Sequence, residues 1–263
     1  MMGPAHSLSG AAAWLGVGAA TAAAGRPMPW PVLVVGALIC AGAALAPDLD
    51  HKSATISRAF GPMSKGVCEV VDKLSYAVYQ ATKKPADPRR SGGHRTLTHT
   101  WLWAVLTGAG ASVLAITGGR WAVLALLFVH LVLAVEGLLW RAARVSSDVL
   151  VWLLGATSAW ILAGVLDQPG NGANWLFEAP GQEYLWLGLP IVLGALVHDI
   201  GDALTVSGCP ILWPIPVGRK RWYPVGPPAF MRFRAGSWVE LKVLMPMFML
   251  LGGVGGAAAL NVI

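Results

Sequence analysis

The sequence predicts an all-α, polytopic integral membrane protein that folds as a single helical bundle over residues 1–263. Hydrophobic residues make up 56% of the chain and charged residues only 12%, whereas soluble domains carry about 25% charged residues. The mean hydropathy is +0.61, and the 13 tryptophans are typical of proteins whose indole rings lie at the level of the lipid headgroups. Too few charged groups remain to cover a water-exposed surface of this size, so a membrane protein is favoured.

Seven apolar stretches approach the roughly 17–25 residues that a helix needs to cross the bilayer. Gly25-Arg26-Pro27 ends the first stretch, and Pro47 ends the second. Gly252 and Gly253 interrupt the last stretch. We therefore expect about seven spans, over residues 8–24, 30–46, 97–117, 121–140, 149–166, 184–206 and 239–263.

Two long polar segments separate these stretches, over residues 48–96 and 207–238. Pro85–Arg90 in the first segment is expected to form a loop. Pro210–Gly236 in the second contains five further prolines after Pro210 and is not expected to form regular helix. Apolar residues at helical spacing in the first segment predict an amphipathic helix that lies in the membrane interface or packs against the bundle. These residues are Val67, Val71, Leu74, Val78 and Ala81.

The distribution of basic residues predicts which side of the membrane the polar segments occupy. With seven spans, the N-terminus and both long polar segments lie on the same side. That side holds 17 of the 19 lysines and arginines, and only Arg26 and Arg120 fall on the other. By the positive-inside rule this side is cytoplasmic, and the chain is expected in the cell (inner or plasma) membrane.

Histidine and aspartate residues gather in four short clusters at the ends of the apolar stretches. Tracing the chain through seven spans puts all four clusters on the cytoplasmic side. Ionisable groups are expensive inside a membrane, so such a gathering is typical of a functional site. The clusters are His6; Asp48, Asp50 and His51; His94 and His99; and His198, Asp199 and Asp202.

The spacing within the clusters is compatible with metal binding. His198 and Asp202 are four residues apart and would share one face of a helix, about 5–6 Å from each other. Asp48 and His51 would share a face if Pro47 opens a helical turn, whereas Asp48 and Asp50 would do so in an extended segment. His94 is expected just before the third span and His99 in its first turn, with Thr96 as the N-cap.

The number of candidate ligands exceeds the four that one tetrahedral zinc ion requires. The three cysteines lack the spacing of a thiolate site, so imidazole and carboxylate groups must hold the metal. We expect two or more divalent ions, with zinc favoured and manganese or iron as alternatives. Such sites suit phosphoester hydrolysis. The candidate ligands are His6, Asp48, Asp50, His51, His94, His99, His198 and Asp202.

Several neighbouring residues are candidates for other roles in the reaction. Asp50 could bridge two ions or act as general base, and Asp199 is expected to orient a neighbouring ligand. Arg95, with the hydroxyls of Thr96 and Thr98, could bind a phosphate group at the start of a helix. The alternative, equally weighted, is that Arg95 is a topology charge and that the threonines only cap the helix.

Three polar features outside the clusters have simpler interpretations. His130, alone in an apolar stretch, is expected to hydrogen-bond between helices. Glu136 is expected either to support a ligand or to pair with Arg141. The basic and aromatic surface of residues 219–223, with Arg232 and Arg234, is expected to contact anionic lipid headgroups. Binding of nucleic acid is disfavoured because the rest of the chain is so apolar.

Three ordered blocks resemble the signature of the YdjM-like membrane-bound metal-dependent hydrolases, and His6 also belongs to that pattern. The resemblance implies a metal-dependent hydrolase but no particular substrate. Thr96 and Asp199 depart from the residues usual in that family, and Trp121–Glu183 lies outside its blocks. The block on residues 198–202 is also similar, over a short length, to the zinc-dependent phospholipase C group. The three blocks are residues 47–51 (PDLDH), 93–99 (GHRTLTH) and 198–205 (HDIGDALT).

These observations predict an integral-membrane hydrolase that cleaves a phosphoester of a lipid or lipid-linked substrate at the cytoplasmic face. Membrane lipid is the expected partner, and the sequence leaves the oligomeric state open. A transporter of ions or metals is one alternative, although a site at one membrane face does not resemble a path across the midplane. A membrane scaffold with structural metals is the other.

Overall fold

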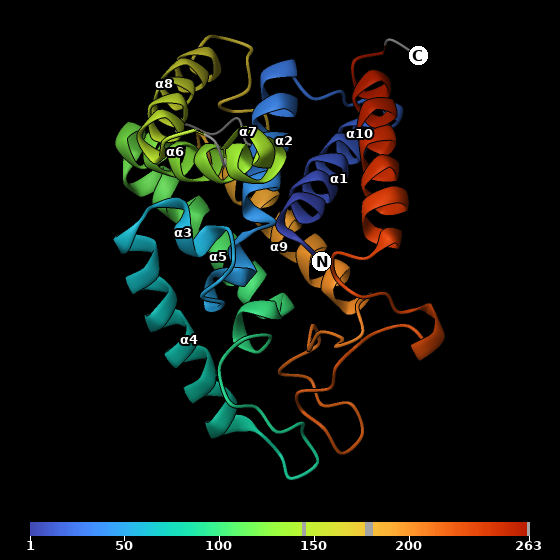
Figure 1. Cartoon of the computed structure of the whole chain (residues 1–263). Helices are drawn as coiled ribbons and strands as arrows, with labels where there is room; N and C mark the ends of the chain where they lie inside the picture. Colours follow the sequence, from blue (N-terminus) through green and yellow to red (C-terminus); the bar gives the residue numbers. More distant parts are fainter. Residues whose placement is uncertain (144–145, 177–180, 262–263) are drawn as a thin grey trace.

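The computed structural model describes residues 1–143, 146–176 and 181–261, and it folds as a bundle of helices with irregular segments at one end (Figure 1). Within those residues only isolated β-bridges occur, so the predicted all-α class is confirmed. The α-helices are α1 (Gly3–Ala23), α2 (Trp30–Ala43), α3 (Ile56–Ala59), α4 (Pro62–Thr82), α5 (Trp101–Thr117), α6 (Gly119–Leu138), α7 (Trp140–Ala143), α8 (Asp148–Leu166), α9 (Gly188–Ala203) and α10 (Met245–Ala259). Short 3₁₀ turns are η1 (Ala46–Asp50), η2 (Leu97–His99), η3 (Leu185–Leu187) and η4 (Ala229–Met231), and η5 (Glu240–Leu244) is a π-helix.

The seven predicted spans correspond in position to α1, α2, α5, α6, α8, α9 and α10. In the described part of the chain, five helical segments are long and apolar enough to cross a membrane, and α5 is a shorter apolar helix of 17 residues. The structure thus supports a polytopic membrane protein with at least five spans, and α1 and α5 complete the predicted seven by position only. The five segments are Trp30–Asp50, Gly119–Leu138, Asp148–Leu166, Leu185–Ala203 and Glu240–Ala259.

Helix α2 lies at the centre of the bundle because small residues let its neighbours approach its backbone closely. A Cβ atom at Gly42 would lie 2.1 Å from the carbonyl oxygen of His130 on α6. The equivalent atom at Gly194 on α9 would lie 2.5 Å from the carbonyl oxygen of Cys40. A Cβ atom at Gly10 on α1 would lie 2.6 Å from the same carbonyl oxygen. Three helices are therefore fixed against α2, whose C-terminal end leads directly into Asp48.

Two predicted helix boundaries are wrong. Helix α5 begins at Trp101 rather than at Leu97, because residues 97–99 form the turn η2 and Thr100 is extended. The N-cap is accordingly Thr100, whose hydroxyl accepts a hydrogen bond from the backbone N–H of Trp103 at 3.2 Å, and not Thr96. Helix α10 also continues through the expected break at Gly252, since this glycine packs against Ala12 of α1.

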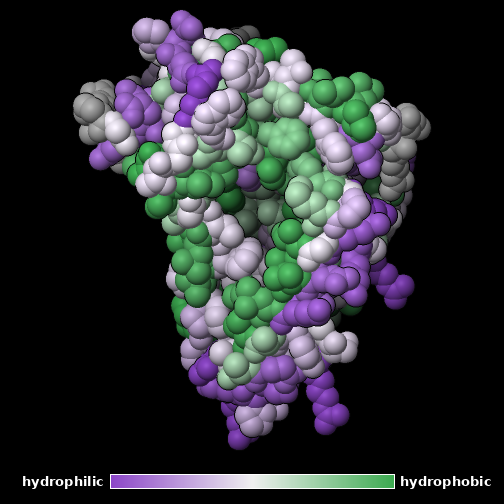
Figure 2. All heavy atoms as spheres, turned by 90° about the vertical axis from the view of Figure 1, so that its left-hand side faces the viewer, coloured by the Kyte–Doolittle hydropathy of each residue, from purple (hydrophilic) through white to green (hydrophobic). Residues whose placement is uncertain are grey.

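The first polar segment contains the predicted amphipathic helix as α4, but its apolar stripe faces outward. Residues on its buried side are small or polar, such as Cys68 and Ser75. In this stripe Val67 is 44% exposed and Leu74 48% exposed, whereas Val78 packs partly buried against the cluster that includes Leu97, so most of the stripe is not covered by the bundle. Figure 2, which views this side of the molecule, shows apolar surface running beside hydrophilic surface.

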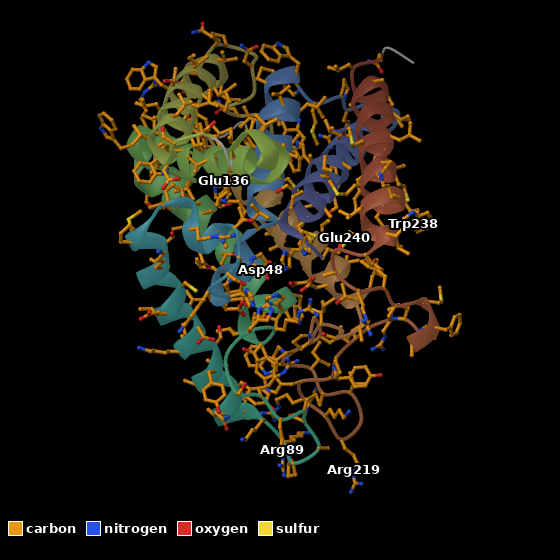
Figure 3. The ribbon with its side chains drawn as sticks, viewed as in Figure 1. Asp48, Arg89, Glu136, Arg219, Trp238 and Glu240 are labelled. Atoms are coloured by element: carbon orange, nitrogen blue, oxygen red, sulfur yellow. The ribbon has the colours of Figure 1, made fainter. Side chains whose placement is uncertain are left out.

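The second polar segment lacks long helices, as predicted, and only η4 interrupts its irregular course. Residues 85–90 also form the predicted loop. The two segments are joined, because Asp87 accepts hydrogen bonds at 2.9 Å from the backbone N–H groups of both Arg221 and Trp222. They lie together at one end of the bundle, where Arg89 and Arg219 are found (Figure 3).

Candidate metal centre

All four predicted clusters meet at the end of the bundle that carries the polar segments, around the imidazole of His99. Turn η1 brings Asp48 and Asp50 to this point from the end of α2, with Pro47 in its first residues, so the segment adopts the helical rather than the extended alternative. Turn η2 supplies His99, and the last turns of α9 supply His198 and Asp202. The site is thus assembled from segments that are far apart in the sequence.

The first group of possible metal ligands consists of Asp48, Asp50, His94 and His99, each of which offers one donor atom within 4.8 Å of the others. Nδ1 of His94 lies 2.9 Å from Oδ1 of Asp50. Nδ1 of His99 lies 3.5 Å from the other oxygen, Oδ2, of the same carboxylate. Asp50 therefore stands between the two imidazoles.

The second group consists of Asp48, His99, His198 and Asp202 under the same limit of 4.8 Å. Nε2 of His99 lies 3.6 Å from Oδ1 of Asp48 and 3.7 Å from Oδ2 of Asp202. Nε2 of His198 lies 3.7 Å and 3.8 Å from the same two oxygens. Since Asp48 and His99 belong to both groups, two neighbouring ions could share ligands here.

Of the two roles predicted for Asp50, bridging ligand or general base, the first is better matched by Asp48. Asp48 belongs to both groups, whereas Asp50 belongs only to the first. Asp48 is also the more accessible carboxylate, with 20% of its side chain exposed against 0% for Asp50. The sequence could not separate the two because both lie in the same short turn.

The orientation of His198 follows from the close packing of α9 on α2. Its Nδ1 lies 2.8 Å from the carbonyl oxygen of Ala44, at the end of α2. A proton on Nδ1 donates to that carbonyl and leaves Nε2 as the acceptor that faces the second group. Such a contact to the far ring nitrogen fixes the tautomer of a metal-binding histidine.

Thr98 and Thr96 are buried and hydrogen-bonded within the protein, which does not support their predicted role in phosphate binding. The hydroxyl of Thr98 donates to Oδ2 of Asp50 at 2.6 Å and lies 2.9 Å from Nδ1 of His99. The hydroxyl of Thr96 donates to the carbonyl oxygen of Gly93. Thr98 therefore orients a carboxylate of the first group, and Thr96 closes the turn that carries His94.

Arg95 lies at the edge of the site and is held by contacts to three residues. Its Nη2 lies 2.8 Å from Oδ2 of Asp202, and its Nη1 donates to the Thr205 hydroxyl at 3.0 Å and to the Gly208 carbonyl at 3.3 Å. The backbone of Arg95 has φ 56°, a conformation that is unfavourable for a non-glycine residue. Surrounding contacts must hold such a residue in place, and this is common at functional sites.

His6, His51 and Asp199 lie at the site but outside both groups. The ring of His6 is fully buried and stacks on that of His198 at 3.7 Å, with Nε2 3.3 Å from Oδ1 of Asp202. His51 contacts Ser53 through Nδ1 at 3.1 Å, and its ring lies 4.4 Å from that of His94. Among the described residues, the oxygens of Asp199 find no hydrogen-bond partner, so no contact supports its predicted orienting role.

The electrostatics of the cluster favour a bound cation. Burial alone would lower the pKa of His99, but the carboxylates of Asp50 and Asp48 outweigh it and raise that pKa to about 10. Nδ1 of buried His6 lacks a hydrogen-bond partner within the described residues, although an unpartnered buried polar group is costly. Carboxylates together with free imidazole nitrogens fit a divalent transition-metal ion.

A cavity of about 1030 Å³ adjoins the cluster. Its wall on the side of the cluster includes Asp48, His94, Arg95 and Asp202, with His51 nearby. The remaining wall comes from α1, α3, η5, α10 and the residues around α6, α7 and α8. In Figure 3, Asp48 lies below Glu136, toward the end of the bundle that carries the polar segments. A substrate in this cavity could therefore reach ligands of both groups.

Three further polar residues clarify what the sequence indicated. His130 does not bond between helices as predicted, because its Nδ1 lies 2.7 Å from the carbonyl oxygen of Leu126 on its own helix. Glu136 lines the cavity, while the side chain of its predicted partner, Arg141, lies outside the described residues. Sequence reasoning missed Glu240, which accepts hydrogen bonds from the backbone N–H groups of Met2 at 2.6 Å and Gly236 at 2.7 Å. The sequence signal that could have identified Glu240 is its position as an acidic residue at the start of an apolar helix.

Comparison with known proteins supports the resemblance seen in the sequence. A family model described as YdjM inner membrane protein matches residues 1–143, which include His6 and the first two blocks. The third block, on α9, lies outside the matched region, but the structure brings it against the other two. No curated protein and no solved structure matches the chain.

Proposed function

Since the chain belongs to the YdjM inner membrane protein family, and its structure gathers two overlapping groups of possible metal ligands, we propose that it is an integral-membrane, metal-dependent hydrolase. Its substrate is a phosphoester of a lipid or lipid-linked molecule. The reaction takes place at the cytoplasmic face, where most of the basic residues are expected. The groups sit at one end of the bundle and not midway along the spans, which argues against the alternative of a transport path.

The observation that carries this proposal is the sharing of Asp48 and His99 between two groups of ligands beside a large cavity. A single structural ion would need only one group of four and no access for a substrate. Two ions close together are typical of enzymes that hydrolyse phosphoesters. Divalent ions held by these residues, with zinc favoured over manganese or iron, would activate water and neutralise charge on the phosphoryl oxygens.

The protein's own side chains would prepare the site for this chemistry. The carbonyl of Ala44 fixes the tautomer of His198, and Thr98 holds Asp50 against both of its imidazole neighbours. Arg95 offsets the negative charge of Asp202 and lines the cavity, where its guanidinium would attract a phosphate group. Asp48, the most exposed carboxylate of the cluster, would face the reacting centre.

Metal analysis of the detergent-purified protein tests this proposal. We expect wild type to retain more than one ion per chain and His198→Ala/Asp202→Ala to lose most of it. His130→Ala removes a buried imidazole outside the cluster and serves as the matched control, with metal content unchanged. Wild type should release phosphate or headgroup from at least one member of a lipid panel. Less than one ion per chain would refute the site, and bound metal without release from any lipid would favour a scaffold.

A further inference from the structure

The cavity lies at the depth of the membrane where the spans end. Its wall includes Leu45 from the span Trp30–Asp50 and Glu136 from the span Gly119–Leu138. It also includes Asp148, the first residue of another span, and Leu241, the second residue of the last. Transmembrane helices end near the headgroup region, so the cavity and the adjoining ligands lie at the level of the lipid phosphates.

The cavity wall has a polar side and a mixed side. Asp48, His94, Arg95 and Asp202 form the polar side, next to the ligand cluster. The rest of the wall is mixed, with the charged residues Arg58, Glu136 and Asp148 on the side of α3, α6 and α8. Its apolar side chains include Leu45, Ile56, Ala143, Leu241 and Met245. A ligand that fills the cavity should therefore carry a charged group and a hydrocarbon part.

The side of the cavity formed by η5 and α10 belongs to the least buried of the five candidate spans in the described residues. Helix α10 packs mainly along α1, and only 6% of the apolar window of this span is buried within the protein. Leu241 lines the cavity and is still 44% exposed. This stretch is a π-helix, a local distortion that is frequent at functional sites. Glu240, the first residue of η5, accepts a hydrogen bond from Met2 and so holds the start of η5 against the start of α1.

We propose that the cavity opens sideways into the bilayer, between η5–α10 and the wall residues Ala143, Ser146 and Asp148. The ligand is a membrane lipid whose phosphate reaches the ligand cluster while its hydrocarbon chains pass Leu241 and Met245 and stay in the leaflet. Such a substrate need not leave the membrane to reach the ligand cluster. Cleavage of this lipid rests on the proposed function, whereas its binding in the cavity does not.

Photo-crosslinking in nanodiscs tests the binding without requiring turnover. The probe is a phospholipid that carries a diazirine near the start of one acyl chain. We expect saturable labelling of peptides that contain Ile56 or Met245, with competition by unlabelled phospholipid but not by inorganic phosphate. Leu241→Trp narrows the opening and should reduce this labelling at least tenfold. Leu250→Trp makes the same change at an exposed leucine that does not line the cavity, and should leave labelling unchanged.

A second variant and a second readout guard against misfolding and against failure of the proposed function. Met245→Trp should act like Leu241→Trp, and both variants should keep the wild-type metal content. Where hydrolysis is measurable, the ratio of lipid turnover to turnover of bis-p-nitrophenyl phosphate, a water-soluble diester, should fall at least tenfold. Labelling that does not saturate, or that responds equally to the substitutions of Leu241 and Leu250, would overturn the sideways opening. Saturable labelling without hydrolysis would instead refute only the hydrolase.

Discussion

Replacing Thr98 by valine removes one hydroxyl from the cluster and should weaken metal binding by a predictable amount. Valine has nearly the same shape, so the packing around this buried position is kept. The hydroxyl donates to the charged carboxylate of Asp50 at 2.6 Å, in a region where water cannot replace it. A hydrogen bond to a charged group contributes about 1.5–3 kcal/mol. Removing a partner that orients a metal ligand typically costs about 10–100-fold in metal affinity, so the loss should lie between about tenfold and one hundredfold.

The assay is competition for zinc between the purified protein and a chromophoric chelator at constant pH. Thr107→Val is the matched control, since its hydroxyl bonds only to carbonyl oxygens of its own helix, at 2.9 Å and 3.1 Å. Thr98→Ser should restore most of the affinity because it returns the hydroxyl. If Thr98→Val bound zinc within about twofold of wild type, the orienting role of this hydroxyl would be wrong, together with the assignment of Asp50 as a ligand.

Four further predictions concern the charge, the packing and the sidedness of the protein. Metal affinity should rise with pH, since the proton that His99 holds up to a pKa of about 10 must leave before the ion binds; an affinity that stays constant from pH 6 to 9 would contradict this. In the metal-free protein, protonated His99 stabilises the fold, and this contribution is complete below the pKa of about 6.5 that histidine has in the unfolded chain. Thermal unfolding should show the contribution disappear as pH rises through about 10, the pKa of His99 in the folded protein. Gly42→Ala should lower the unfolding free energy by at least about 1–3 kcal/mol, because the new Cβ would lie 2.1 Å from the His130 carbonyl oxygen, whereas Gly66→Ala on α4 has open space and should not be destabilising. Arg219→Cys should react with a membrane-impermeant thiol reagent only from the cytoplasm and Arg120→Cys only from the outside, and the reverse pattern would invert the proposed topology.

The helices and their membrane character could be predicted from the sequence because they depend on local composition. Long apolar stretches bounded by glycine, proline and charged residues gave the correct positions of α2, α6, α8 and α9. The boundaries were less predictable, because they depend on contacts that only the folded chain makes. Thr96 and Thr100 are both threonines near the start of α5, and it is the bond of Thr96 to Gly93 that leaves the capping position to Thr100.

Most of the cluster could also be predicted from the sequence, because six of the eight candidate ligands fall in the two groups and only His6 and His51 do not. The roles within the cluster could not be predicted. Spacing on one helix identified His198 and Asp202 as a pair, and the structure places both in the same group. No spacing rule could show that Asp48 is common to both groups, since this depends on how η1 meets α9 and η2. The outward stripe of α4 was similarly hidden, because helical periodicity shows that a face exists but not what it contacts.

The central claim is that the two overlapping groups hold metal ions, and anomalous X-ray scattering from crystals of wild-type protein tests it most directly. Data collected above and below the zinc absorption edge should show two neighbouring peaks beside Asp48 and His99, each about 2.0–2.2 Å from its nitrogen and oxygen ligands. The corresponding edges of manganese and iron would identify either alternative. A cluster without any anomalous peak at these edges, in crystals grown with the metals supplied, would contradict the claim.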